Sequence, residues 1–219
     1  MLKMVRYRNR EQWLKARKRF IGGSDVSCIL GLNPYKTNVQ LYREKKGLVE
    51  PDDLSDNPLV AYGTQAEEHI RALFSLDRSD LEVEYIKDNS WRNTDYPFAA
   101  ASLDGWSQDE NGRHGILEIK TANITSKAQA EKWKDGKIPD NYYCQVLFYL
   151  AVTEWDYVDL RANLKYDLPD KDLFIITKDF HIERTDPNVE DDIATSMEAT
   201  AKFAERLKKN EEPPLLLTI

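Results

Sequence analysis

Two stretches of this sequence decide its fold: Ala101-Ser102-Leu103-Asp104-Gly105-Trp106 and, after a turn, Gly115-Ile116-Leu117-Glu118-Ile119-Lys120-Thr121. Both runs carry the β-branched and aromatic side chains typical of strands. Between them stands Asn111-Gly112, which is the strongest short-range signal for a β-hairpin. We therefore expect the two runs to pair as antiparallel neighbours in a sheet.

The length of the connecting loop decides which side chains face each other. A two-residue Asn111-Gly112 turn places Asp104 opposite Ile119. A three-residue loop over 110–112, with Gly112 in the left-handed conformation, places Asp104 opposite Glu118 and leaves Lys120 on the same face. We favour the second register because it is chemically coherent. Two opposed carboxylates about 5 Å apart imply a bound cation or a shifted pKa.

The residue types around this hairpin favour a hard divalent cation. Carboxylate oxygens suit Mg²⁺ or Mn²⁺, and a lysine beside a metal-held phosphate can steady an attacking hydroxide or the developing negative charge. The three histidines and two cysteines are scattered, which argues against a zinc finger, an iron–sulfur cluster or a disulfide scaffold. The alternative is structural: Asp104-Gly105 forms a bend, and Glu118 and Lys120 form an exposed polar edge.

The rest of the chain predicts an α/β sandwich with a mixed sheet in one domain. No internal repeat, low-complexity tract or long Gly/Ser linker divides the 219 residues. Helices are expected at 10–20, 38–46, 61–74, 126–135, 140–153 and 188–210. Strands are expected at 82–86, 98–106, 115–121, 155–164 and 172–183.

Charge is distributed unevenly along the chain. The net charge is −7, yet residues 1–46 contain twelve Lys and Arg against three acidic residues. Such a basic part can attract a polyanion to one surface, whereas the alternative is a solvated, charge-rich helix face. No apolar stretch approaches the ~20 residues that span a bilayer, and the N-terminus is not signal-like, so we expect a cytoplasmic protein without membrane contact.

The spacing of Asp104 and Glu118-Ile119-Lys120 resembles the signature of the PD-(D/E)XK nuclease superfamily. Further segments resemble one of its branches, the YqaJ-type viral recombinases, which include bacteriophage lambda exonuclease. In order, they are Arg17 through Ile21-Gly22-Gly23-Ser24-Asp25, then Tyr62-Gly63-Thr64-Gln65-Ala66-Glu67, then Tyr142-Tyr143-Cys144-Gln145. The resemblance runs from about residue 13 to about residue 150. It implies a restriction-endonuclease-like core, with a central mixed β-sheet flanked by helices.

The resemblance also implies roles for individual residues. The implied metal ligands are Asp104, Glu118, the backbone carbonyl of Ile119, and Glu67, and they would hold Mg²⁺ or Mn²⁺, with two ions per site once DNA is bound. The implied catalytic residues are Lys120, Gln145 and Glu67, and the implied 5′-phosphate ligands are Arg17 and Ser24. Ser102 precedes Asp104 by two residues and should lie on the same face, so Ser102 is a further candidate for contact with the phosphate.

Each of these assignments has a structural alternative. Glu67 can form an ion pair with Arg71 at i+4, and Gln145 can be a surface or capped amide. Arg17 can be one more solvated cation. Ser24-Asp25 can be a plain helix N-cap. The apolar tail at 213–219 can pack on its own domain or on a neighbouring subunit.

The implied activity is metal-dependent 5′-to-3′ exonuclease action on the 5′-phosphorylated strand of linear duplex DNA, which leaves 3′ overhangs for annealing. The alternatives are a PD-(D/E)XK endonuclease or repair nuclease, or a DNA-end-binding scaffold without activity. The implied partners are duplex DNA, a single-strand annealing protein and two further copies in a homotrimer ring, within a phage- or prophage-encoded system. In the nuclease domain 1–219, we assign 1–47 to DNA-end binding, 61–183 to the catalytic core and 188–210 to a C-terminal helix.

Overall fold

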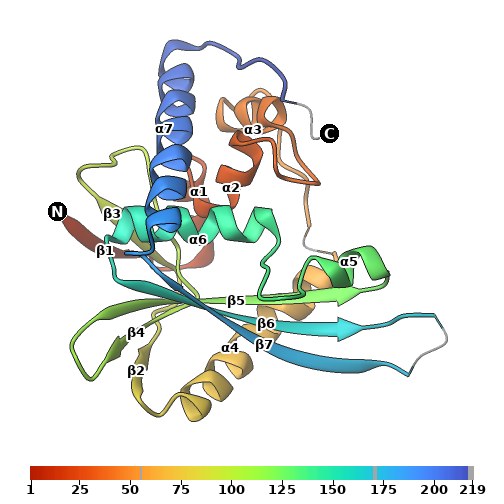
Figure 1. Ribbon diagram of the computed structural model, residues 1–219. Helices are drawn as coiled ribbons and strands as arrows, with labels where there is room; N and C mark the ends of the chain where they lie inside the picture. Colours follow the sequence, from red (N-terminus) through yellow and green to blue (C-terminus); the bar gives the residue numbers. More distant parts are fainter. Residues whose placement is uncertain (55, 170–171, 217–219) are drawn as a thin grey trace.

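A five-stranded mixed sheet forms the centre of the protein, and helices cover both of its faces (Figure 1). The computed structural model describes residues 1–54, 56–169 and 172–216. The strand order is β2-β4-β5-β6-β7, in which β5 and β6 are parallel and the other neighbours are antiparallel. The bounds are β2 Leu81–Glu84, β4 Gly105–Asp109, β5 His114–Ile124, β6 Tyr157–Tyr166 and β7 Phe174–Glu183.

A second, two-stranded sheet and the helices complete the described fold. The small sheet pairs β1 (Leu2–Arg6) with β3 (Asn89–Asn93) in antiparallel orientation. The helices are α1 Arg10–Arg17, α2 Gly23–Ile29, α3 Asn38–Lys45, α4 Pro58–Asp77, α5 Lys127–Glu131, α6 Asp140–Thr153 and α7 Pro187–Lys209. None of the described helices has the length and apolar character needed to cross a bilayer. This architecture confirms the α/β fold with a central mixed sheet flanked by helices.

The β4–β5 hairpin has the register that the three-residue loop predicts. Gly105 pairs with Leu117. Gly112 has a φ of 78°, and its N–H donates to the carbonyl of Asp109 at 2.9 Å. Asp104 immediately precedes β4, so continuing this register brings it to the level of Glu118. The favoured register is therefore confirmed.

The alternation along β5 sends its side chains to two different cores. Ile116 joins the larger core, which lies between the sheet and α6 and extends to α2 and α7. Leu117 and Ile119 join a smaller core with Phe74 on α4, on the opposite face (Figure 1). Glu118 and Lys120 thus lie on the α6 face, as the period of two predicts for side chains that alternate with Leu117 and Ile119.

Several elements differ in extent from the prediction. Helix α4 begins earlier than residue 61, because Asn57 caps it and Pro58 occupies its first turn. The strand expected at 98–106 begins only at Gly105, and Ala99 and Ala101 form isolated bridges instead. The two strands of the small sheet were not predicted.

The described part of the apolar tail contacts its own chain. The side chain of Asn38 donates to the carbonyl of Pro214 at 2.7 Å and accepts from the N–H of Leu216 at 3.1 Å. Asn38 is buried, so these bonds hold the tail against the start of α3. Residues 217–219 of the predicted apolar tail lie outside the described residues.

Candidate active site

A cavity of about 650 Å³ opens where α1, α2, α4 and α6 meet the start of β4 and the middle of β5. It contains every site residue named from the sequence. Those lining residues are Arg17, Ser24, Glu67, Ser102, Asp104, Glu118, Ile119, Lys120 and Gln145. Segments more than 120 positions apart in the chain therefore contribute to one concave site.

Three side chains form a closed polar group at the base of this cavity. Glu118 Oε1 accepts a hydrogen bond from Gln145 Nε2 at 2.6 Å and lies 2.6 Å from Lys120 Nζ. Lys120 Nζ also donates to Gln145 Oε1 at 3.0 Å. The bonds fix both ends of the Gln145 amide, so this residue is not a surface amide. Helix α6 thereby orients the two charged groups that β5 supplies.

The second carboxylate is held beside β5 by a backbone bond. Asp104 Oδ2 accepts from the N–H of Ile119 at 2.9 Å. It takes this bond just beyond the point where the β4 pairing ends, so the side chain of Asp104 replaces the next strand residue as acceptor. The Asp104 backbone carbonyl accepts from Arg71 Nε at 2.6 Å. Hydrogen bonds therefore fix both the side chain and the backbone of Asp104.

Burial makes ionisation of the two carboxyl groups unfavourable. Burial and the neighbouring Asp104 raise the pKa of Glu118 to about 8, and burial raises the pKa of Asp104. Burial opposes the charge of Lys120, but the carboxylates of Glu118 and Asp104 outweigh it and raise its pKa. Glu118 is 1% exposed, and its Oε2 is a buried atom without a hydrogen-bond partner. A buried carboxylate oxygen left unpaired beside a second carboxylate fits a divalent cation.

Glu67 approaches the same carboxylates from α4. Burial and Asp104 raise its pKa to about 7, while Arg71, Lys120 and Arg10 act to lower it. The described residues contain no group of three His, Cys, Asp or Glu side chains close enough to hold a metal ion. Asp104 and Glu118 are thus the carboxylate pair of the site. No direct ion pair of Glu67 with Arg71 forms among the described residues, although the charge of Arg71 acts to lower the pKa of Glu67. The Arg71 guanidinium lies 3.6 Å from the ring centre of Tyr85.

The basic end of the cavity is built by α1 and the first turn of α2. Arg17 Nη2 donates to Ser24 Oγ at 3.2 Å, and the Arg17 guanidinium lies 4.6 Å from the ring centre of Trp13. Trp13 Nε1 donates to Ser102 Oγ at 3.2 Å, which ties this end to the segment before β4. Ser24 is not the helix cap: Gly22 is the N-cap, and its N–H donates to Asp25 Oδ2 at 2.9 Å.

Two residues that support the site were not identified from the sequence. The Tyr149 hydroxyl accepts from Gln145 Nε2 at 2.9 Å, and its ring packs so closely on Gly23 that an added Cβ would lie 2.5 Å away. Tyr149 follows Gln145 by four positions on α6, and Arg71 follows Glu67 by four on α4. The i+4 spacing was the available signal, because it places residues on one helix face.

Comparison with known proteins places this geometry in a family. Residues 12–156 match the model of the YqaJ-like viral recombinase domain. Protein YqaJ of Bacillus subtilis (strain 168) is 36% identical over 149 residues, which are 68% of this chain and 44% of that protein. The protein R354 of Acanthamoeba polyphaga mimivirus is 29% identical over 161 residues, 68% of this chain and 28% of that protein. The chain thus spans less than half the length of these curated relatives.

The fold also resembles solved exonuclease structures. An alkaline exonuclease, LHK-Exo, from Laribacter hongkongensis aligns with a TM-score of 0.57 at 22% identity, over 91% of this chain and 97% of that chain. A phage-related exonuclease from Haemophilus somnus 129PT aligns with a TM-score of 0.50 at 16% identity, over 87% and 96% of the two chains. These likenesses establish the fold. The family model, which matches well over half of the residues, shows that the chain belongs to the YqaJ-like viral recombinase family.

Proposed function

We propose that this protein is a divalent-metal-dependent exonuclease that hydrolyses the 5′-phosphorylated strand of linear duplex DNA in the 5′-to-3′ direction, leaving 3′ single-stranded overhangs for annealing. One observation carries the proposal. The buried, unpaired Glu118 Oε2 lies in the cavity that also contains Asp104, Lys120 and the Arg17–Ser24 pair. The exonucleases that share this fold and the recombinase family support the same reaction class.

The residues that would hold the metal are Asp104, Glu118, the backbone carbonyl of Ile119, and Glu67. The donor set is all oxygen, which suits Mg²⁺, with Mn²⁺ as a substitute, and we propose two ions once DNA is bound. Because Mg²⁺ takes six oxygen ligands, water and a DNA phosphate oxygen would complete the coordination that these residues begin. When bound, the metal supplies Lewis-acid polarisation of the phosphate, a lowered pKa of water and charge neutralisation at the leaving oxygen.

Lys120 acts in its protonated form. The neighbouring carboxylates raise its pKa, so it is a poor general base at neutral pH. Its ammonium group can orient the attacking water and stabilise negative charge on the phosphate. Gln145 keeps this group in place through the bond from Lys120 Nζ to its Oε1. Together they position the nucleophile beside the carboxylate pair.

Arg17 and Ser24 bind the 5′-phosphate of the DNA end. A guanidinium can donate two parallel hydrogen bonds to a phosphate, and the Ser24 hydroxyl can donate a third. Trp13 holds Arg17 by its ring and Ser102 by its indole N–H, which sets the distance from the phosphate site to the carboxylates. Such a fixed distance would place the first phosphodiester bond at the reacting centre.

Family membership alone supports the expected location and partners of the protein. The protein would act in the cytoplasm of a bacterial host as a phage or prophage product. It would work with a single-strand annealing protein and as a homotrimer ring around DNA.

The test is digestion of linear duplex DNA carrying a ³²P-labelled 5′-phosphate. We expect Mg²⁺-dependent release of labelled mononucleotide before any loss of a 3′ label, and no cutting of covalently closed circular DNA. Lys120→Ala should abolish hydrolysis and retain DNA binding. Arg17→Ala should impair 5′-phosphorylated ends more than 5′-hydroxyl ends.

Three outcomes would contradict the proposal. Cutting of closed circles would indicate an endonuclease. Binding of DNA ends without any hydrolysis by the wild type would indicate a scaffold. Equal losses on both kinds of end in Arg17→Ala would remove Arg17 and Ser24 from phosphate binding.

A further inference from the structure

A second, shallower groove of about 330 Å³ lies on the other flank of α1. Its lining includes Tyr7, Gln12, Lys15, Arg19, Phe20 and Arg92. On a helix with 3.6 residues per turn, Gln12 and Lys15 lie almost opposite Trp13 and Arg17, which line the main cavity. Tyr7, Ala16 and Phe20 line both hollows, so the groove and the cavity share a wall.

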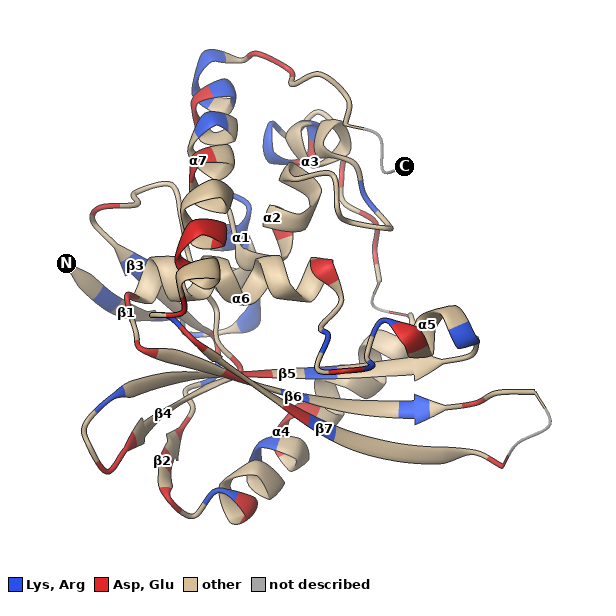
Figure 2. Ribbon diagram, viewed as in Figure 1, with Lys and Arg blue, Asp and Glu red and all other residues tan. Residues whose placement is uncertain are grey.

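The groove is positively charged and lacks acidic partners. Its three cationic residues are Lys15, Arg19 and Arg92, and no Asp or Glu among the described residues lines it. In the described part of the chain, none of these three forms an ion pair, whereas the neighbouring Lys18 pairs with Glu50 at 3.1 Å. In Figure 2, Lys and Arg colour parts of α1, β1 and β3, while the chain as a whole is acidic. Such unpaired charge on one surface favours a polyanion.

Among the described residues, Arg92 has no acidic partner. Its guanidinium lies 4.1 Å from the ring centre of Phe20 and donates to the Tyr7 hydroxyl. Its Nε is buried without a hydrogen-bond partner. A half-buried guanidinium held by two rings and no carboxylate keeps its charge without compensation, which is costly unless a ligand supplies the negative group.

We propose that this groove binds the phosphodiester backbone of DNA outside the end held in the cavity. This inference rests on the proposed function and deepens it, since it assigns a second contact to the same substrate. Lys15 lies on the last turn of α1, and Arg19 follows the end of that helix at Arg17; both line the groove. Arg92 faces them from β3. Cations spaced along a groove match a repeating polyanion better than a single phosphate ion.

The backbone could belong to the duplex or to the 3′ single strand that hydrolysis leaves, and binding experiments separate the two. We would use the Lys120→Ala background without metal, so that no DNA is cut. Two 5′-phosphorylated ligands are compared by fluorescence anisotropy across KCl concentrations: a blunt duplex and the same duplex with a 3′ overhang. The variants are Lys15→Gln, Arg19→Gln and their double, because both side chains are exposed and their loss should not affect folding.

Lys202→Gln is the matched control, since Lys202 is an exposed cation on α7 that lies outside both hollows. Log affinity falls as log salt rises, and each groove variant should make this negative slope less steep by about one. The double variant should make it less steep by about two. Each lost phosphate contact corresponds to a three- to fourfold smaller salt effect between roughly 50 and 200 mM KCl.

The outcomes separate as follows. A less steep salt dependence with both ligands supports contact with the duplex. A less steep salt dependence with the overhang ligand alone supports contact with the single strand. Slopes equal to that of the Lys202→Gln control with both ligands would overturn the proposal, as would absence of DNA binding by the parent protein. Failure of the proposed function is seen separately, as absence of hydrolysis by the wild type. Arg92→Gln, checked by its melting temperature, provides a third variant.

Discussion

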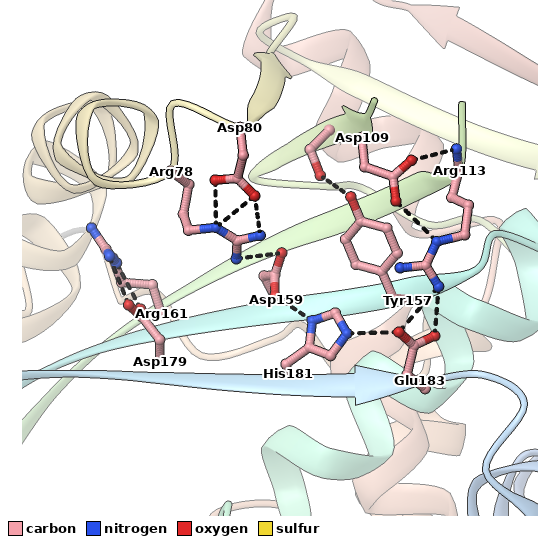
Figure 3. Close-up of polar contacts among 11 residues, drawn as sticks. Arg78, Asp80, Asp109, Arg113, Tyr157, Asp159, Arg161, Asp179, His181 and Glu183 are labelled. Carbon is pink, nitrogen blue, oxygen red and sulfur yellow. Dashed lines mark hydrogen bonds and ion pairs between the residues drawn. The ribbon is translucent and has the colours of Figure 1, made fainter. Parts of the chain in front are cut away.

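Two clusters of charged side chains lie along the central sheet, and they differ in whether the protein neutralises its own charge. In the active-site cluster, Glu118 is buried and Asp104 is half-buried beside one lysine, and an oxygen of Glu118 is unpaired. The second cluster, which we call the ion-pair network, lies across β4, β6 and β7 (Figure 3). It consists of Arg78, Asp80, Asp109, Arg113, Asp159, His181 and Glu183.

Opposite charges alternate through the ion-pair network. Arg113 Nε lies 2.9 Å from Asp109 Oδ2, and its Nη1 lies 3.0 Å from Glu183 Oε2. His181 lies between two carboxylates, with Nδ1 2.7 Å from Asp159 Oδ1 and Nε2 2.9 Å from Glu183 Oε1. Arg78 Nη1 lies 3.7 Å from Asp159 Oδ2, which has no hydrogen bond of its own. Each carboxylate in the network therefore faces a cation of the same chain.

The comparison separates a structural cluster from a binding cluster. Both contain buried carboxylates, so burial of acidic residues alone does not identify a site. The active-site cluster lines a cavity. Burial raises the pKa of both carboxyl groups, and the charge of Asp104 raises the pKa of Glu118 further. The network lines neither described hollow. A buried carboxylate without a neutralising partner, next to a cavity, indicates that a cation binds there from solution.

The largest expected effect is on activity, from Asp104→Asn. The amide keeps the shape of the side chain but removes one of the proposed carboxylate ligands, so kcat on 5′-phosphorylated duplex should fall roughly 10²–10³-fold or more. The free energy of unfolding should be unchanged or slightly higher without metal, because a like charge beside Glu118 is removed. Single-turnover digestion and urea unfolding measure the two quantities. A kcat within about threefold of wild type would contradict the metal-ligand role of Asp104.

The matching change in the ion-pair network is Asp159→Asn, and its expected effect is on stability. The Asp159 side chain is 5% exposed and faces His181 and Arg78. Neutralising it should cost about 1–3 kcal/mol in the free energy of unfolding, measured by urea titration. The kcat of the folded variant should stay within about threefold of wild type. A loss of kcat like that of Asp104→Asn, without loss of stability, would place the network in the reaction and remove the distinction drawn here.

The sequence predicted the active-site cluster better than the network, for a physical reason. Asp104, Glu118 and Lys120 lie on one hairpin, so a loop length and a period of two are enough to bring them together. Asp159 and His181 are opposite each other only through the pairing of β6 with β7. Neither strand carries a turn signal close enough to set that register. A buried pair that depends on long-range register leaves no local motif.

The small sheet escaped prediction for a related reason. Strand β3 contains the polar run Asn89–Asn93, which has little of the composition typical of strands. Asn89 is nevertheless buried, because its amide donates to the carbonyl of Leu103 at 2.8 Å and accepts from the N–H of that residue at 3.1 Å. Here a side chain takes the place of a neighbouring strand. Such a bond is invisible to hydrophobic periodicity, whereas helix α7, in which Val189, Ile193 and Met197 are buried at intervals of four residues, follows that periodicity closely.

The smallest expected effect concerns pH and separates the clusters by their response to metal. Glu118 has a pKa of about 8 in place of 4.5, and hydrogen bonding to Asp159 raises the pKa of His181 above 6.5. A raised folded-state pKa gives stability that is present below the unfolded pKa and lost as pH rises through the folded value. Both groups therefore make the metal-free protein less stable as pH rises from about 5 to about 9.

Metal should restore only the Glu118 contribution, because binding requires the ionised carboxylate. The metal affinity should rise up to about tenfold per pH unit between roughly 6 and 8, so the Mg²⁺-induced increase in Tm should be larger at pH 8.5 than at pH 6.5. His181→Gln should leave that increase unchanged and reduce only the metal-free pH dependence, by less than about 1 kcal/mol, because the imidazole is partly exposed. Thermal melts in Mg²⁺ and in EDTA measure both. A Tm increase that is flat with pH would mean that no proton is displaced from Glu118, and its unpaired oxygen would then not be a metal ligand.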